Sequence, residues 1–180
     1  MKICLRTAFV VFLIGGLLLF GGCGESVPER RGTEGEDFCA ELRGRLALEG
    51  EGLDFVAKIE VRNGIGGREV TLSYLAPEAL EECVICVAVS DAGEMLGQAE
   101  LRRRGIVASV DADALSGLLL PARALLSAGE TKSLVREGDG WRIGLGEGAE
   151  WILSADGTPK RFSAPKISFD VVWFESGGVQ

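Results

Sequence analysis

Residues 38–62 read FCAELRGRLALEGEGLDFVAKIEVR, and this stretch decides the fold. Apolar side chains recur at alternate positions, from Phe38 to Leu48 and again from Leu53 to Val61, with charged side chains between them. Period-two alternation predicts strands that bury one face and expose the other. Residues 49–52 contain two glycines and reverse the chain, so the stretch predicts a long antiparallel hairpin.

The same alternation predicts further strands at residues 69–75, 95–104, 106–110, 132–136, 141–145, 149–155 and 167–175. Residues 83–89 are apolar on both sides, which is typical of a strand that is covered on both faces. Asp-Gly pairs at 139–140 and 156–157 indicate hairpin turns. Pro159 and Pro165 are expected to interrupt the chain before the last strand, where Ile167, Phe169, Val171 and Trp173 should share one face.

One leucine-rich segment differs from this pattern. Asp113 can cap a helix that runs through Leu115, Leu118 and Leu119, and Pro121 should break or restart it before it continues to residue 126. The sequence therefore predicts a mainly β domain with minor α, made of antiparallel strands in sequential hairpins with one leucine-rich helical insertion. A β-sandwich or a small closed barrel is the alternative.

The N-terminus has a different composition. Lys2 and Arg6 precede an apolar run over residues 8–20, and Gly21, Gly22 and Cys23 follow it. The expected organisation is a signal peptide over residues 1–22, a lipidated Cys23 with a flexible tether to residue 37, a domain over 38–175 and a loose tail over 176–180. Arg30 and Arg31 stand among acidic residues, so we expect them to be solvated.

This leader resembles the bacterial lipoprotein signal, with Phe20 where the family usually has leucine. The resemblance implies that Cys23 carries a diacylglyceryl thioether and an acylated amino group, such as palmitate. These chains would anchor the protein at the extracytoplasmic face of a cell membrane. The alternatives are an uncleaved membrane anchor and an ordinary secretory signal with an incidental cysteine.

Composition limits the chemistry of the domain. Loss of the two basic leader residues takes the net charge from −8 to −10, which makes nucleic acid an unlikely partner because both would be anionic. The sequence has no histidine, which excludes Ser-His and Cys-His nucleophile schemes. We expect no enzyme activity, no metal and no cofactor. Cys83 and Cys86 are expected to be structural, although Cys39 is a candidate disulfide partner for either in an oxidising compartment.

The long hairpins and the mid-chain helical segment resemble the half-barrel of the lipoprotein-carrier family, which includes the outer-membrane lipoprotein carrier and its receptor. That resemblance implies a strongly bent antiparallel sheet (a half-barrel) under a leucine-rich helical lid, with an apolar cavity between them that holds acyl chains. We expect the cavity to be lined by large inward side chains: Phe55, Ile59, Leu72, Tyr74, Leu118, Trp151 and Trp173. For the three tryptophans, Trp141, Trp151 and Trp173, simple core packing is favoured over a place in the cavity wall.

Two functions follow from these expectations. The first is an anchored lipoprotein that binds a lipid, an acyl chain or another apolar ligand. The second is a non-catalytic structural, sensing or interaction lipoprotein with a closed core, whose partner is another envelope protein.

Overall fold

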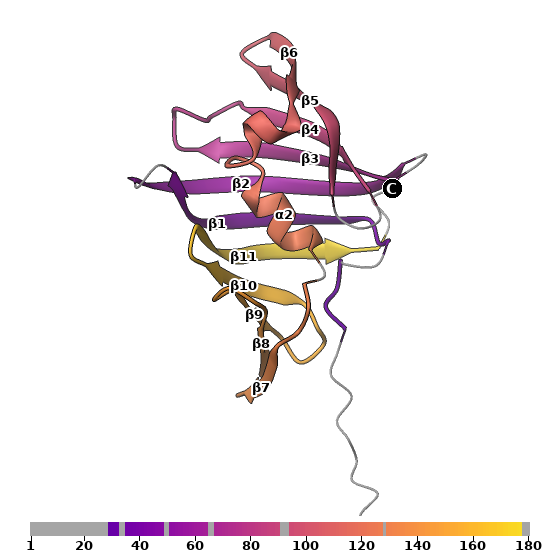
Figure 1. Cartoon of the computed structure of the whole chain (residues 1–180), viewed down its shortest axis with the longest axis vertical. Helices are drawn as coiled ribbons and strands as arrows, with labels where there is room; N and C mark the ends of the chain where they lie inside the picture. The colour runs from indigo at the N-terminus through magenta and orange to yellow at the C-terminus, as the bar shows by residue number, and fades with distance from the viewer. Residues whose placement is uncertain are drawn as a thin grey trace, which may run out of the picture.

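The structure is a computed structural model that describes residues 29–32, 35–48, 51–64, 67–90, 94–127 and 129–177. The leader and Cys23 lie outside these residues. The described chain is mainly β, with 62% strand and 8% helix (Figure 1). Its elements in chain order are β1 (Phe38–Leu48), β2 (Glu51–Gly64), β3 (Gly67–Ala76), β4 (Val84–Val89), β5 (Met95–Arg103), β6 (Ile106–Asp111), η1 (Ala112–Leu115), α2 (Leu120–Leu126), β7 (Ser133–Glu137), β8 (Gly140–Gly144), β9 (Glu150–Leu153), β10 (Pro159–Ala164) and β11 (Ile167–Ser176).

All eleven strands belong to one antiparallel sheet in the order β6-β5-β4-β3-β2-β1-β11-β10-β9-β8-β7. The sheet is not closed, since β6 and β7 are its two edges. The predicted fold class is therefore confirmed, and the described residues form neither a closed barrel nor two packed sheets. Two meanders, β1–β6 and β7–β11, meet where β1 pairs with β11 at the middle of the sheet.

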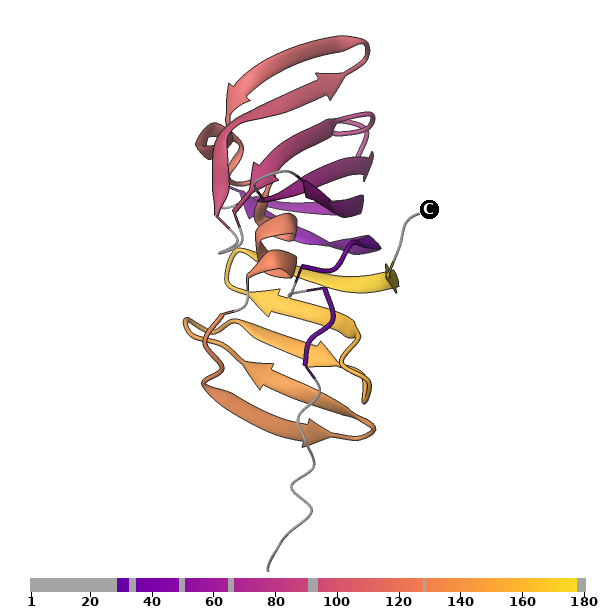
Figure 2. The same cartoon turned by 90° about the vertical axis from the view of Figure 1, so that its right-hand side faces the viewer.

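The order of the strands explains where the helix lies. Strand β6 ends at one edge and β7 begins at the other, so the connection between them must cross the sheet. This connection contains η1 and α2, and Figures 1 and 2 show α2 lying across the middle strands on one side of the sheet. We call this side the covered face and residues 112–126 the lid segment. Pro121 stands at the first turn of α2 and restarts the helix, as predicted, because a proline at this point removes no helical hydrogen bond.

The hairpin that opens the fold has the predicted alternation. In the β1–β2 register, Leu42 faces Ala57 and Leu46 faces Leu53, while Arg45 faces Asp54 on the other side of the sheet. Apolar residues of the covered face pack into one cluster with the lid segment. The largest of its fully buried side chains are Trp151, Tyr74, Phe38, Phe55, Leu42, Leu46, Ile59, Leu72, Ile85, Leu119, Leu153 and Val61.

The prediction of an interruption was wrong for residues 159–164 and right for Pro165, which stands in the turn before β11. Residues 159–164 form strand β10, which pairs with both β9 and β11. Pro159 is the first residue of the strand, where a missing N–H is tolerated, and the register shifts between Pro159 and Arg161. Phe162 then points to the covered face and packs against Trp151, with 4.8 Å between the ring centroids.

Candidate functional site

The candidate site is the covered face of the sheet, where most of the predicted cavity residues lie. Five of them, Phe55, Ile59, Leu72, Tyr74 and Trp151, are at most 2% exposed. The lid segment packs on this surface through buried Leu119, Ala122, Leu125 and Leu126. These five side chains therefore form a packed core beneath the lid rather than the wall of an open cavity.

Tyr74 connects this core to the lid segment. Its hydroxyl donates a 2.6 Å hydrogen bond to the backbone oxygen of Leu118. The Tyr74 ring also packs edge-on against Phe55, with 6.0 Å between centroids. Burial raises the pKa of the Tyr74 phenol, so the hydroxyl stays protonated and remains a donor at physiological pH.

Leu118 is the predicted residue that does line an opening. A cleft of about 680 Å³ lies between the β1–β2 hairpin and the first half of the lid segment. Its apolar lining comes from Leu53 on the sheet and from Leu115 and Leu118 on the lid. Glu51, Gly52, Ala114 and Gly117 complete the lining. The cleft thus lies at the edge of the packed core and opens to solvent beside it.

Trp173 does not belong to this site. The β1–β11 register shifts between Glu41 and Leu42, which places Leu42 opposite Val171 but Glu41 opposite Trp173. The bulged residue, Val172, reverses the alternation of the strand. Trp173 consequently lies on the face opposite the lid, 45% exposed, and the expectation that it shares a face with Val171 was wrong.

That opposite face has a hollow of its own. A groove of about 830 Å³ crosses the middle strands and is lined by Arg43, Arg45 and Arg161 together with Asp54 and Asp170. Arg45 pairs with Asp54 at 3.8 Å and Arg161 with Asp170 at 2.5 Å. The charged groups of this groove largely pair with one another, whereas the described residues that line the cleft beside the lid include one charged residue, Glu51.

Arg30 is the main residue that the sequence reasoning missed. Its guanidinium lies 4.7 Å from the centroid of the Trp151 ring. It donates hydrogen bonds to the backbone oxygens of Ala124, at 3.1 Å, and Ser127, at 2.5 Å, at the C-terminal end of α2. A cation is favourable there because the last carbonyls of a helix carry partial negative charge. Burial lowers the pKa of Arg30 to about 10, which leaves it charged at neutral pH.

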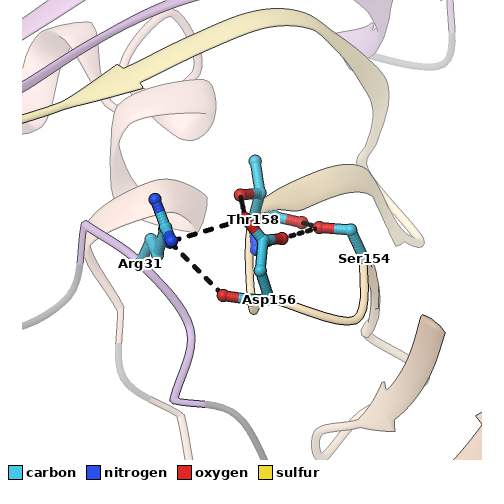
Figure 3. A network of polar contacts seen from close by, with 4 residues as sticks. All are labelled: Arg31, Ser154, Asp156 and Thr158. Carbon is cyan, nitrogen blue, oxygen red and sulfur yellow. Dashed lines mark hydrogen bonds and ion pairs between the residues drawn. The ribbon is translucent and has the colours of Figure 1, made fainter.

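Arg31 is held by the β9–β10 turn (Figure 3). Its guanidinium lies 3.4 Å from the Asp156 carboxylate, and its backbone N–H donates to Gly157 O at 3.2 Å. The hydroxyl of Ser154 and the N–H and hydroxyl of Thr158 donate to the same carboxylate. These hydrogen bonds, with the charge of Arg31, lower the pKa of Asp156 to about 2.

Arg68 holds the chain just before β1. It is 6% exposed and donates to the backbone oxygens of Gly32, at 3.1 Å, and Glu36, at 3.0 Å. Asn63 adds contacts to Gly35 and Asp37. Residues 29–32 and 35–37, which we call the strap, therefore lie against the domain. The prediction that Arg30 belongs to a solvated spacer was wrong, because its guanidinium lies against Trp151 and the end of α2. Arg31 is exposed, as predicted, but pairs with Asp156.

The remaining candidates fill structural positions. All three cysteines in the described residues are free, with Cys39 and Cys83 buried and Cys86 half-buried on the face opposite the lid. The candidate disulfide is thus not formed, and burial raises the pKa of the Cys39 and Cys83 thiols. Asp111 accepts from the N–H of Asp113 and caps η1. Among the described residues, no three metal-ligating side chains gather at one point.

No helix in the described part of the chain has the length and apolar character needed to span a bilayer. No protein-family model matches the chain, and neither does any curated protein sequence. An uncharacterized conserved protein from Thermus thermophilus has a similar structure, with a TM-score of 0.50 at 13% identity over 81% of this chain and 82% of that one. A domain from Vibrio parahaemolyticus assigned to outer membrane lipoprotein sorting aligns with a TM-score of 0.46 at 9% identity, over 80% and 86% of the two chains. At such identities the likeness concerns the fold, and the function must be argued from this chain's own residues.

Proposed function

We propose that this protein is an extracytoplasmic lipoprotein, anchored through Cys23, that binds an acyl chain or a similar apolar ligand between the sheet and the lid segment. The observation that carries the proposal is the cleft whose lining includes Leu53, Leu115 and Leu118. A volume of about 680 Å³ is in the range of small-ligand sites. The cleft also leads directly to the apolar core beneath the lid.

The way the lid is held supports this reading. The lid segment rests on the sheet mainly through leucine and alanine side chains, and apolar contacts are not directional. An acyl chain offers the same kind of surface, so it can replace these contacts at little cost. The Tyr74 hydroxyl supplies a polar contact between sheet and lid, at Leu118 O. We therefore expect an acyl chain to enter at the cleft and to extend under the lid as α2 moves outward.

The anchor is tested by Cys23→Ala in the full chain expressed in bacteria. The wild-type protein should fractionate with membranes and gain the mass of its acyl chains, whereas the variant should be released. Retention of the variant in membranes would mean that the leader itself stays as an anchor.

The ligand is tested by native mass spectrometry of the soluble domain and by titration with a fluorescent fatty acid. We expect a copurifying lipid or a saturable complex with the probe. Leu118→Asp places a charge in the cleft and should abolish probe binding, because desolvating a carboxylate against an acyl chain is costly. Leu134→Asp is the matched control, since Leu134 is exposed on β7. Equal binding by both variants would refute the cleft as the site.

A second function is favoured by a different observation. The core beneath the lid is already filled by Trp151, Tyr74 and their neighbours. A closed core supports a non-catalytic structural, sensing or interaction lipoprotein whose surface meets another envelope protein. Apo protein that binds no acyl probe would favour this function over the first.

A further inference from the structure

The strap determines how far the domain can lie from its anchor. The described chain begins at Glu29, only six residue steps after Cys23. Six steps span at most about 22 Å, whereas fifteen steps to Phe38 would span about 54 Å. The contacts of Arg30, Arg31 and Arg68 therefore remove more than half of the reach that the sequence alone would give the tether.

The strap also determines which side of the domain is nearest the anchor. Arg30 is bonded to the C-terminal end of α2, and Arg31 to the turn between β9 and β10. Glu29 thus leaves the domain beside these two features, in the half of the sheet formed by β7–β11 (Figure 1). The edge strand β6 is eight strand spacings from β9, which is about 38 Å along the sheet. The two ends of the molecule therefore lie at different distances from a membrane surface that holds Cys23.

Charge separates the two halves in the same direction. Residues 129–166, which contain β7–β10, have six acidic and six basic residues. Residues 38–128 have fourteen acidic and nine basic residues, a net charge of −5. Anionic head groups repel the second set as a whole and are indifferent to the first. The acidic excess lies outside β5 and β6, because residues 95–111 have two acidic and three basic residues. Exposed apolar residues do not distinguish the two edges, since β7 exposes Leu134 and Val135 and β6 exposes Ile106 and Val107.

We propose that the surface around the β9–β10 turn and the C-terminal end of α2 faces the lipid bilayer, held there by the docked strap. This inference rests on the proposed lipidation of Cys23. The occupant of this surface is the membrane in which the acyl chains of Cys23 are inserted. The far edge of the sheet, at β5 and β6, points away from it.

The test uses the lipidated full chain in vesicles of phosphatidylethanolamine and phosphatidylglycerol, in a Cys86→Ser background. A fluorophore is placed at Ala155→Cys, in the β9–β10 turn, or at Ile106→Cys, on the exposed start of β6. Head-group spin-labelled lipid then quenches whichever fluorophore lies near the surface. We expect severalfold stronger quenching at position 155 than at 106. Equal quenching, or stronger quenching at 106, would overturn the orientation.

Two variants test whether the strap causes the orientation. The double variant Arg30→Ala, Arg68→Ala should remove the difference in quenching between positions 155 and 106. Arg43 is a surface arginine outside the strap, and Arg43→Ala should preserve that difference. An insertion of ten Gly-Ser residues after Ser26 leaves the folded domain untouched and should also reduce the difference. If both changes leave the difference intact, the strap does not set the orientation.

Docking of the strap has its own readout, independent of the membrane. In the soluble domain, trypsin should cleave the chain slowly after Arg30 and Arg31. In the Arg68→Ala variant, cleavage at these two sites should be much faster. Rapid cutting in the unmodified domain would refute docking. Failure of the lipidated chain to sediment with vesicles, with the strap still protected, would instead refute the anchor and with it the proposed function.

Discussion

Replacing Tyr74 by phenylalanine should loosen the lid without disturbing the core. The substitution removes the hydroxyl that donates to Leu118 O at 2.6 Å and keeps the ring that packs on Phe55. Loss of such a hydrogen bond costs about 1 kcal/mol, and up to about 3 kcal/mol if the buried carbonyl finds no other partner. A cost of about 1 kcal/mol raises the population of an open lid about fivefold.

Hydrogen exchange and ligand titration measure this effect in the soluble domain. The amides of α2 should exchange about fivefold faster in Tyr74→Phe, while those of β1 and β2 change by no more than the loss of global stability. If an acyl chain binds under an open lid, the apparent affinity for the fatty-acid probe should rise by up to the same factor. Ser109→Ala is the control, since it deletes a hydroxyl whose partner, Gln98, is on the surface. Unchanged exchange in α2 would refute the role of the Tyr74 hydroxyl in holding the lid.

Three further predictions address the sheet and the strap. Trp151→Ala should lower the free energy of unfolding in urea by about 3–5 kcal/mol, whereas Trp173→Ala should cost no more than about 1 kcal/mol, and equal costs would contradict the bulge that separates their faces. Gly44→Ala should lower the free energy of unfolding by at least about 2 kcal/mol, because the added Cβ would clash with the backbone oxygen of Ser168 on β11. A stable variant with unchanged near-ultraviolet circular dichroism would contradict the β1–β11 register. Asp156 has a folded-state pKa of about 2, below its unfolded value near 4, so its stabilising contribution is complete above pH 4 and is lost as the pH falls to 2. Asp156→Asn should flatten the dependence of the unfolding free energy on pH in that window. An unchanged dependence would contradict the hydrogen-bond network around Asp156.

The hairpins were predictable because each depends on neighbouring residues. Alternation between residues 38 and 62 specified both strands, and the turn between them specified their pairing. The pairing of β1 with β11 depends on strands more than a hundred residues apart, and no local pattern reports it. Once that pair is known, the two meanders run outward and the lid must cross between the outer edges. The position of the lid is thus a consequence of the one long-range pairing.

The errors at β10 and Trp173 have a common physical cause. Strand patterns are read on the assumption of strict alternation, and a bulge adds one residue that reverses it. Residues 171–174 read VVWF, four apolar residues in a row, so hydrophobicity could not show which of them turn inward. Tertiary pairing decided it: Val171 lies opposite Leu42, and Phe174 stacks on Phe38 with 5.4 Å between centroids. At β10, Pro159 could begin a strand because the register shift beside it accommodates a residue without an N–H.

Arg30 shows why the composition of a segment does not decide whether it is ordered. A run of glycine, proline and charged residues is typical of a spacer, since it offers little apolar surface of its own. Arg30 acquires its order from groups more than ninety residues away: the Trp151 ring and the carbonyls at the end of α2. Those groups exist as a site only after the sheet has formed and the lid has crossed it. The strap must therefore dock late in folding, and its loss should leave the sheet intact, which is why Arg30 and Arg68 can be varied to test the orientation of the domain at the membrane.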